Sequence, residues 1–245
     1  MLKIINQFWD SPQKILIILA HPDDPEFFLG GTIAKWILEG HIVSYCLLTR
    51  GEKGINEEFC NRDVNFIKNL RREEQERAAG ILGVNDIFFY DNPDGYLFPD
   101  LLVRRQIVRT VRIKQPDIVV SCDPTNYFIR DDYINHPDHR AAGQAVVDSI
   151  FPAAQNISFF PDLLIKEGLK PHRTKEVWLA LPAQANVVVD ITNVWEIKLR
   201  ALHEHKSQIG NIPQFDERMQ SRRSADSTPE EPRYEETFHR IIFRK

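Results

Sequence analysis

Apolar residues along this chain fall into two kinds of segment. The first kind is a short continuous run rich in β-branched residues, such as residues 14–20, which is typical of a strand buried on both faces of a parallel sheet. The second kind spaces apolar residues three and four apart among polar ones, as in residues 101–113, which predicts an amphipathic helix. Strands are predicted at 14–20, 41–49, 86–91, 117–121, 176–181 and 187–191, and helices at 30–40, 70–82, 101–113, 141–150 and 193–208.

The order of these segments predicts the fold class. Strands that alternate with helices form βαβ units, and their repetition predicts a Rossmann-like three-layer α/β/α sandwich with a mostly parallel central sheet. We expect a single domain over residues 1–245, with a Rossmann-like core at about 14–150 and a C-terminal extension at about 151–245. Within that extension, residues 210–233 are dense in charge, Ser and Pro, which predicts a surface loop or lid, and residues 238–243 return as a final packed element.

Composition narrows the class of protein. A chain of 245 residues with 42% apolar residues can build an ordinary hydrophobic core. The net charge is 31 − 35 = −4, which offers no basic field for nucleic acid, so the expected partners are small molecules. No apolar run approaches the ~18 residues that span a bilayer, and the N-terminus lacks the features of a signal peptide. We therefore expect no membrane span and a cytoplasmic location.

Cysteine usage agrees with that location. Cys46, Cys60 and Cys122 are an odd and widely spaced set without a CxxC motif, which favours reduced thiols over a disulfide framework. We expect them to be small core or loop residues, with Cys122 at the end of a predicted strand.

Candidate chemistry lies in the loops that follow the predicted strands. In an open α/β sheet, ligands bind beyond the carboxyl ends of the strands. The first such loop has His21, Asp23 and Asp24 where a dinucleotide-binding protein would have a glycine-rich fingerprint, so a metal ion is favoured over a phosphate. A second cluster, His136-Pro-Asp-His139, follows another strand, and two nitrogens with one carboxylate oxygen are the ligand set of a catalytic zinc site. The alternative for either cluster is an ordinary Asx turn or helix cap.

Several short motifs have the order and spacing of a known family. The motifs are AHPDD at 20–24 followed by GGT at 30–32, TRGE at 49–52, RREE at 71–74 leading to ILGV at 81–84, PDG at 93–95, HPDH at 136–139, and IKLRAL at 197–202 with HKSQ at 205–208. On these motifs the chain resembles the LmbE/PIG-L-like zinc-dependent N-acetylglucosaminyl deacetylases over most of its length. One departure is Pro25, which stands where many relatives have Glu and displaces Glu26 by one position, so the resemblance assigns no role to Glu26.

The resemblance implies a role for each residue of the first cluster. Zinc would be held by His21, Asp24 and His139, with Asp23 as the general base. These roles are chemically consistent, because zinc lowers the pKa of a water ligand to about 7 and a neighbouring carboxylate can take the proton. Other divalent metals fit similar ligands.

Four further roles follow from the same resemblance. His136 matches a histidine that, as an imidazolium, stabilises the oxyanion, and Asp138 matches the partner that orients it, although Asp138 is also a plausible helix N-cap. Arg71 and Asp94 match substrate-binding positions. The alternatives are a solvated helix face for Arg71 and an ordinary Asp-Gly turn for Asp94.

The expected activity is therefore zinc-dependent removal of an N-acetyl group from an N-acetylglucosamine-containing small molecule or glycoconjugate. Two alternatives stay open: a zinc amidohydrolase acting on a non-sugar N-acyl substrate, and a non-catalytic sugar- or nucleotide-binding module of the same fold. Substrate specificity should reside in residues 50–68 and 209–233. The resemblance is also compatible with a homo-oligomer.

Overall fold

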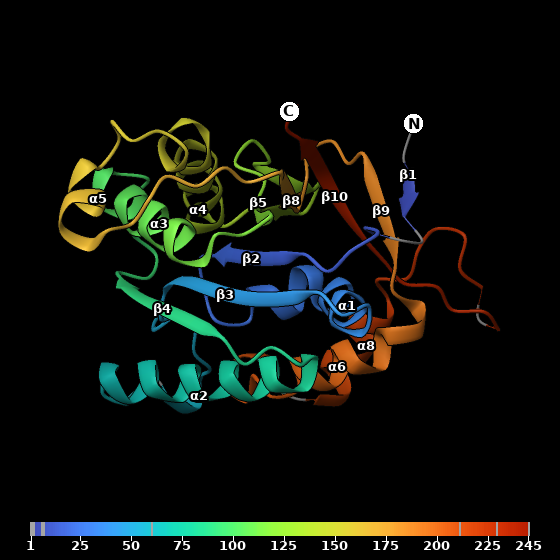
Figure 1. Cartoon of the computed structure of the whole chain (residues 1–245). Helices are drawn as coiled ribbons and strands as arrows, with labels where there is room; N and C mark the ends of the chain where they lie inside the picture. The colour runs from blue at the N-terminus through green and yellow to red at the C-terminus, as the bar shows by residue number, and fades with distance from the viewer. Residues whose placement is uncertain (1–2, 6–7, 60, 211, 229, 245) are drawn as a thin grey trace.

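The computed structural model of the protein describes residues 3–5, 8–59, 61–210, 212–228 and 230–244. One eight-stranded sheet with the order β1-β9-β10-β8-β5-β2-β3-β4 divides the molecule into two helical layers (Figure 1). The strands are β1 (Lys3–Ile5), β2 (Lys14–Leu19), β3 (Ile42–Thr49), β4 (Ile87–Asn92), β5 (Ile118–Cys122), β8 (Glu176–Ala180), β9 (Val187–Asp190) and β10 (Glu235–Ile242), and a separate hairpin pairs β6 (Phe128–Arg130) with β7 (Tyr133–Ile134).

Helices cover both faces of this sheet. Helices α3, α4 and α5 lie on one side in Figure 1, and α1, α2, α6 and α8 lie on the other. The helices are α1 (Asp24–Leu38), α2 (Val64–Leu82), α3 (Leu101–Lys114), α4 (Pro137–Asp148), α5 (Pro161–Glu167), α6 (Trp195–Leu202), α7 (Lys206–Ile209) and α8 (Ile212–Gln220), with 3-10 turns at η1 (Glu57–Phe59) and η3 (Thr192–Val194) and a π-helical turn at η2 (Ser149–Ala154).

The predicted three-layer architecture is confirmed. Strands β4, β3, β2, β5 and β8 are parallel neighbours, and only β10 runs antiparallel, between β8 and β9. Burial on both faces of the sheet explains why the sequence of β2 is continuously apolar. Ile15, Ile17 and Leu19 face one core, whereas Leu16 and Ile18 face the other. The strand order reverses between β2 and β5, which is the topological switch point where ligands bind in such sheets.

Helix α1 begins earlier than its apolar pattern predicts. The helix starts at Asp24, since Pro25 is tolerated in a first turn, and it is then broken at Leu29, where φ is −149°. Close packing at the break requires glycine, because a Cβ atom on Gly31 would lie 2.6 Å from the side chain of Ile191. The first turn of α1 therefore has a direction of its own, set by the break.

A buried ion pair satisfies the backbone on both sides of this break. Lys198 Nζ donates to the carbonyl of Phe27 (3.0 Å) and to Glu236 Oε1 (2.6 Å). The Glu236 carboxylate also accepts the N–H groups of Gly31 (3.0 Å) and Thr32 (2.7 Å). Helix ends leave such groups without intrahelical partners, and a carboxylate at a helix N-terminus also stabilises the helix dipole. Residues from α6 and β10 thus hold the first turn of α1 in place.

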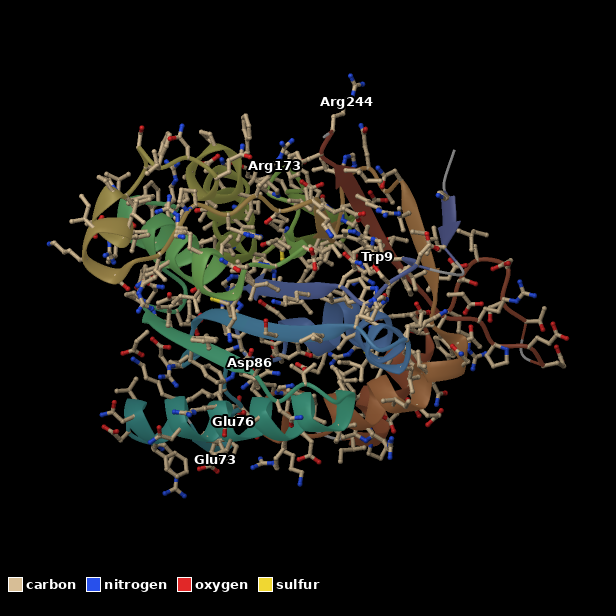
Figure 2. The ribbon with its side chains drawn as sticks, viewed as in Figure 1. Trp9, Glu73, Glu76, Asp86, Arg173 and Arg244 are labelled. Carbon is tan, nitrogen blue, oxygen red and sulfur yellow. The ribbon has the colours of Figure 1, made fainter. Side chains whose placement is uncertain are left out.

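The charged run in α2 divides between two faces. Arg71, Glu74 and Gln75 are buried, whereas Glu73 and Glu76 lie on the outer side of the helix (Figure 2). The exposed residues form pairs four positions apart, with Arg72 Nε 2.7 Å from Glu76. The solvated face predicted as the alternative for this run therefore exists, but Arg71 is not part of it.

Five features of the described chain differ from the sequence pattern. Strand β1, the β6–β7 hairpin and helices α5 and α8 were not predicted, because each is short or carries few apolar residues. Helix α8 buries only Phe215 and Met219, which is too weak a periodicity to distinguish from a loop. The predicted helix at 193–208 is divided into η3, α6 and α7.

The thiols behave as expected where the structure describes them. Cys46 and Cys122 are buried and unpaired, and Cys60 lies outside the described residues. Burial raises the pKa of Cys46 to about 12 and that of Cys122 well above its ordinary value, so both stay protonated. Within the described part of the chain, no helix is both long and apolar enough to cross a lipid bilayer.

The Lys198–Glu236 pair generates a prediction about stability. Replacing Lys198 with Met or Glu236 with Gln should lower the free energy of unfolding by about 3–5 kcal/mol, because either change leaves a buried group without its charge partner. The double variant should cost less than the sum of the two single variants. Urea unfolding measures all three, and simple additivity would contradict the coupling. The control is Glu76→Gln on the exposed face of α2, which should change stability by about 0.5 kcal/mol or less.

The Glu176 carboxylate generates a prediction about pH. Burial alone would raise the pKa of Glu176, but hydrogen bonds from Arg240, Trp178 and Trp9 outweigh burial and hold the pKa below its ordinary value of 4.5. A lowered pKa stabilises the folded state above 4.5, and this contribution is lost as pH falls through the folded-state pKa. Glu176→Gln should therefore be less stable than the unmodified protein at neutral pH, with the difference closing in acid. A difference that does not change with pH in urea unfolding would refute this assignment.

Candidate active site at the switch point

The predicted site residues meet in one cavity at the carboxyl edge of the sheet. The loop after β2 supplies His21 to Asp24, the loop after β4 supplies Asp94, and the start of α4 supplies His136 to His139. These segments contribute to the lining of a cavity of about 950 Å³. The cavity lies at the switch point between β2 and β5, as the fold predicts.

The backbone of the first loop is strained at Asp23. This residue has φ 87°, in the region that side chains other than glycine rarely adopt, and its N–H donates to Gln75 Oε1 (2.8 Å). Asp23 occupies the N-cap position of α1, but its side chain makes no capping hydrogen bond. The helix-cap alternative therefore does not describe Asp23, whose carboxylate lines the cavity instead.

The carboxylate of Asp24 lies between two imidazole rings. Its Oδ2 atom is 3.4 Å from His21 Nδ1, and its Oδ1 atom is 3.0 Å from His139 Nε2. His136 is close as well, since His21, His136 and His139 have nitrogen atoms within 4.8 Å of one another. Two imidazole nitrogens and a carboxylate oxygen are a ligand set that suits a divalent metal with one position open for water or substrate.

The remaining nitrogen of each ring is fixed by a second partner. His139 Nδ1 lies 3.1 Å from Asn135 Oδ1, which can only accept, so the proton belongs on Nδ1 and the Nε2 lone pair faces Asp24. His21 Nε2 lies 3.1 Å from Asp94 and 3.3 Å from Asp138, which by the same reasoning leaves Nδ1 free to bind a metal. Such outer partners orient metal-binding histidines in general.

Asp94 and Asp138 form a second acidic group around His21, and both are already hydrogen-bonded to the backbone. Asp94 Oδ2 accepts the N–H of Lys53 (2.7 Å), and Asp138 accepts those of Gly95 (2.7 Å) and Leu97 (3.2 Å). These bonds use the carboxylate oxygens to orient His21 and join the loops. The group of His21, Asp94 and Asp138 therefore fits a supporting role better than a metal site of its own.

The electrostatics of the site call for a positive charge. Burial lowers the pKa of His21, but Asp24, Asp138 and Asp94 outweigh it and raise the pKa well above its ordinary value. Burial likewise opposes ionisation of the acids, yet the two histidines hold the pKa of Asp24 far below its ordinary value, and His21 helps to lower that of Asp94 to about 2. Three buried carboxyl groups thus surround His21, and a divalent cation would satisfy the same demand.

His136 and Asp138 differ from the roles that the resemblance implies. His136 caps α4, with its Nδ1 atom accepting the backbone N–H of Asp138 (3.1 Å). Among the contacts of the described residues, the Asp138 carboxylate joins His21 rather than the ring of His136. Burial and the charges of His21 and His139 lower the pKa of His136, and because Nδ1 accepts the N–H of Asp138, a proton on the ring lies on Nε2. The N-cap expected of Asp138 is provided by His136.

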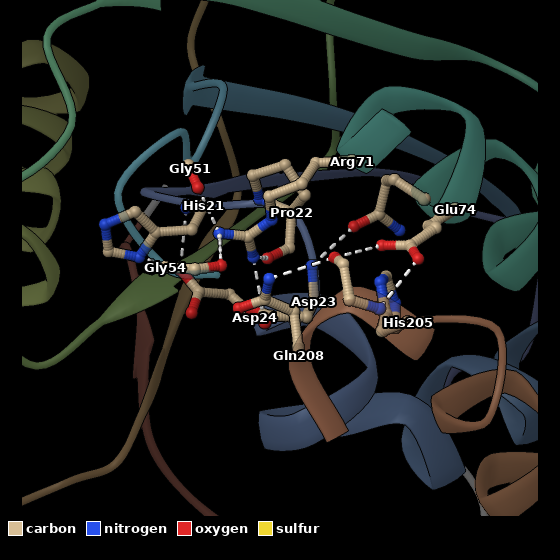
Figure 3. Close-up of polar contacts among 12 residues, drawn as sticks. His21, Pro22, Asp23, Asp24, Gly51, Gly54, Arg71, Glu74, His205 and Gln208 are labelled. Carbon is tan, nitrogen blue, oxygen red and sulfur yellow. Dashed lines mark hydrogen bonds and ion pairs between the residues drawn. The ribbon is translucent and has the colours of Figure 1, made fainter. Parts of the chain in front are cut away.

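Arg71 is directed at the protein rather than left free for substrate. The residue is 3% exposed, and its guanidinium donates to the carbonyls of Pro22 (2.7 Å), Gly51 and Gly54 (3.3 Å) and to Asp23 Oδ2 (3.0 Å), as Figure 3 shows. The loop must contain glycine, since a Cβ atom on Gly51 would lie 2.3 Å from the guanidinium. Arg71 lines the cavity, but these contacts make it chiefly a positioning group for Asp23.

Sequence reasoning missed the buried network behind Asp23. Gln75 Nε2 donates to Glu26 Oε1 (2.9 Å), and His205 Nε2 lies 3.1 Å from Glu26 Oε2. Because Gln75 also accepts the N–H of Asp23, the strained loop is connected through Glu26 to His205 in the C-terminal segment. The available signal was the spacing of Arg71, Gln75 and Ala78 on one face of α2, which marks the buried side of the charged run.

The segment after α6 adds a second bridge to α2. Glu74 accepts both the N–H (2.8 Å) and the hydroxyl (2.6 Å) of Ser207, and Gln208 Nε2 donates to that hydroxyl (3.0 Å). Figure 3 shows Glu74, His205 and Gln208 beside Arg71 and Asp23. These contacts place His205 and Ser207 behind the site as packing and hydrogen-bonding residues.

Known proteins are similar to this chain in sequence and in fold. A diacetylchitobiose deacetylase of Thermococcus kodakarensis is 37% identical over 205 residues, which cover 83% of this chain and 73% of that protein. A probable N-acetyl-alpha-D-glucosaminyl L-malate deacetylase of Bacillus anthracis is 32% identical over 152 residues, 60% of this chain and 63% of that protein. The crystal structure of an N,N'-diacetylchitobiose deacetylase from Pyrococcus horikoshii superposes with a TM-score of 0.83 at 30% identity, covering 94% of this chain and 84% of that one.

The family model agrees with these relatives. The model described as PIG-L: GlcNAc-PI de-N-acetylase matches residues 16–150, the part of the chain that contains every metal-site candidate. A match over more than half of the chain, together with the Thermococcus relative, confirms the resemblance that the motifs indicated. The chain belongs to the PIG-L family of N-deacetylases.

Proposed function

We propose that the protein is a zinc-dependent hydrolase that removes the N-acetyl group from an N-acetylglucosamine-containing small molecule or glycoconjugate. The observation that carries the proposal is the position of Asp24 between His21 Nδ1 and His139 Nε2, with the carboxylate of Asp23 on the same cavity wall. Family membership makes the protein an N-deacetylase, and the names of the relatives favour amino-sugar substrates over a non-sugar N-acyl compound. The retained acid and ligand residues argue against a binding module without catalysis.

His21, Asp24 and His139 would hold the metal. Bound zinc would act as a Lewis acid, polarising the amide carbonyl and lowering the pKa of the attacking water. Asn135 contacts the ring of His139, and Asp94 and Asp138 contact that of His21, so the nitrogen that would bind the metal keeps its orientation in each ring.

Asp23 is the general base in this proposal. Burial, aided by the charge of Asp24, raises the pKa of Asp23 against the opposing effect of Arg71. A raised pKa suits a carboxylate that takes a proton from the attacking water and delivers it to the leaving amine nitrogen. Arg71 and Gln75 keep the side chain and the backbone of Asp23 in place during both transfers.

His136 is the hydrogen-bond donor in this proposal. Its Nδ1 atom is engaged by the backbone N–H of Asp138, so Nε2–H is available to the substrate carbonyl oxygen as negative charge develops there. A preorganised donor of this kind typically contributes about 2.7–4 kcal/mol to the stabilisation of the transition state. Attack by water, cleavage of the C–N bond and protonation of nitrogen yield acetate and a free amine.

Replacing Asp23 with Asn tests the general base. We expect the turnover number to fall by a factor on the order of 10²–10⁴, because the amide cannot accept the proton. Bound zinc should be retained, and asparagine tolerates the positive φ at this position. Acetate release and zinc content are measured on the same preparation. Activity that persists at the original level would remove Asp23 from the mechanism.

Replacing His139 with Ala tests the metal site. The purified variant should contain less than the stoichiometric zinc expected of the unmodified protein, and added zinc should no longer raise its melting temperature. The control is His172→Ala, because His172 lies outside the cavity lining and contacts the carbonyl of Pro116. Equal zinc content in the unmodified protein and the His139 variant would refute the ligand assignment.

A further inference from the structure

The cavity is lined by three arginines as well as by the metal-site candidates. Arg130 belongs to β6, Arg218 to α8 and Arg222 to the turn that follows α8. The β6–β7 hairpin and the α8 segment are far apart in the sequence, so it is the fold that brings the three arginines to the wall of one cavity. Arg218 and Arg222 lie within residues 209–233, where we expect specificity to reside.

These arginines lack the buried carboxylate partners that other arginines of the protein have. Arg218 contacts the ring of Phe215, 5.4 Å from its centroid, and among the described residues neither Arg218 nor Arg222 forms an ion pair. Arg130 lies 3.4 Å from Asp132, whose side chain is 80% exposed. An exposed pair of this kind contributes little, so the positive charge of the wall is largely uncompensated.

Glu235 and Glu236 also line the cavity, but they do not compensate the positive charge of the three arginines. Glu236 is bound to Lys198 and to two backbone N–H groups at the break in α1. Glu235 is exposed, and the charges that act on its carboxyl are those of Asp226, Asp190 and Arg233. Burial and the charges of Arg218 and Arg130 lower the pKa of Arg222, which agrees with guanidinium groups crowded together.

We propose that Arg130, Arg218 and Arg222 form a subsite for an anionic group, a carboxylate or a phosphate, on the part of the substrate away from the N-acetyl group. The inference rests on the proposed deacetylase function and specifies its substrate class. Guanidinium groups bind such anions through paired, charge-assisted hydrogen bonds. Arg71 is not available for this task because its donors are directed at Pro22, Gly51 and Asp23.

The size and the lining of the cavity fit this assignment. Besides the histidines and the arginines, the lining includes Trp195 and Tyr234, whose rings are stacked with their centroids 3.7 Å apart. An uncharged sugar ring suits these aromatic residues, and the acetamido group suits the metal-site residues. The volume of about 950 Å³ holds a ligand larger than a single sugar.

A matched pair of substrates tests the subsite. An N-acetylglucosaminyl derivative of a hydroxy acid and its methyl ester differ only in the charge at the distal end. We expect the holoenzyme to release acetate from the acid with a kcat/KM about tenfold or more above that for the ester, mainly through KM. The double variant Arg218→Gln/Arg222→Gln should bring the ratio close to one. The control is Arg223→Gln, an exposed residue outside the cavity lining, which should keep the preference.

The outcomes separate the subsite from the activity. If the unmodified enzyme deacetylates acid and ester equally, the subsite is refuted and the deacetylase function stands. If neither compound releases acetate, the proposed function fails, and binding of inorganic phosphate to the holoenzyme by titration calorimetry decides on the subsite. Weaker phosphate binding in the double variant than in Arg223→Gln supports the anionic subsite, and equal binding in both overturns it.

Discussion

Three buried carboxylates around one imidazole are the constraint on which the site depends. Asp24, Asp94 and Asp138 are between 0% and 4% exposed, and ionised groups at that depth need compensation. Part of it comes from backbone N–H groups of the loops after β2, β3 and β4, which are thereby fixed in position. Positive charge on His21, whose pKa is raised, or on a metal ion beside it would supply the remainder. The arrangement that orders these loops is thus the same one that favours a metal, and structure and chemistry cannot be altered separately at this edge of the sheet.

Much of the fold can be predicted from the local pattern of apolar and polar residues, because burial against the two faces of the sheet imposes that pattern on the strands and helices. The run in β2 and the periodicity of α3 identify their elements directly. Elements whose stability comes from distant partners leave a weaker trace. The buried residues of helix α8 are Phe215 and Met219. The first turn of α1 depends on contacts with Lys198 and Glu236 rather than on its own periodicity. No window of sequence around either element contains those contacts.

For the site, the sequence likewise identifies some residues directly but not the partners that they contact. His21, Asp24 and His139 could be named because their residue types and motifs are specific, and the structure brings them together. The partners of these residues could not be read reliably. Asp138 contacts His21 instead of His136, and Arg71 contacts Asp23 and backbone carbonyls, since each choice depends on the angle at which a loop meets a helix. The link from Asp23 through Gln75 and Glu26 to His205 joins positions separated by up to 179 residues, beyond the reach of spacing arguments.

The position of β10 bears on the order in which the molecule is completed during synthesis. This strand pairs with both β8 and β9, so β9 and β1 have no place in the sheet before β10 arrives. The N–H groups of Gly31 and Thr32 also lack their acceptor, Glu236, until β10 has been made. The residues His21 to Asp24 are synthesised long before β10, yet the first turn of α1, to which Asp24 belongs, gains its carboxylate cap only when β10 has been made. A nascent chain cut short before that strand would carry the metal-binding motifs without the cavity that makes them useful.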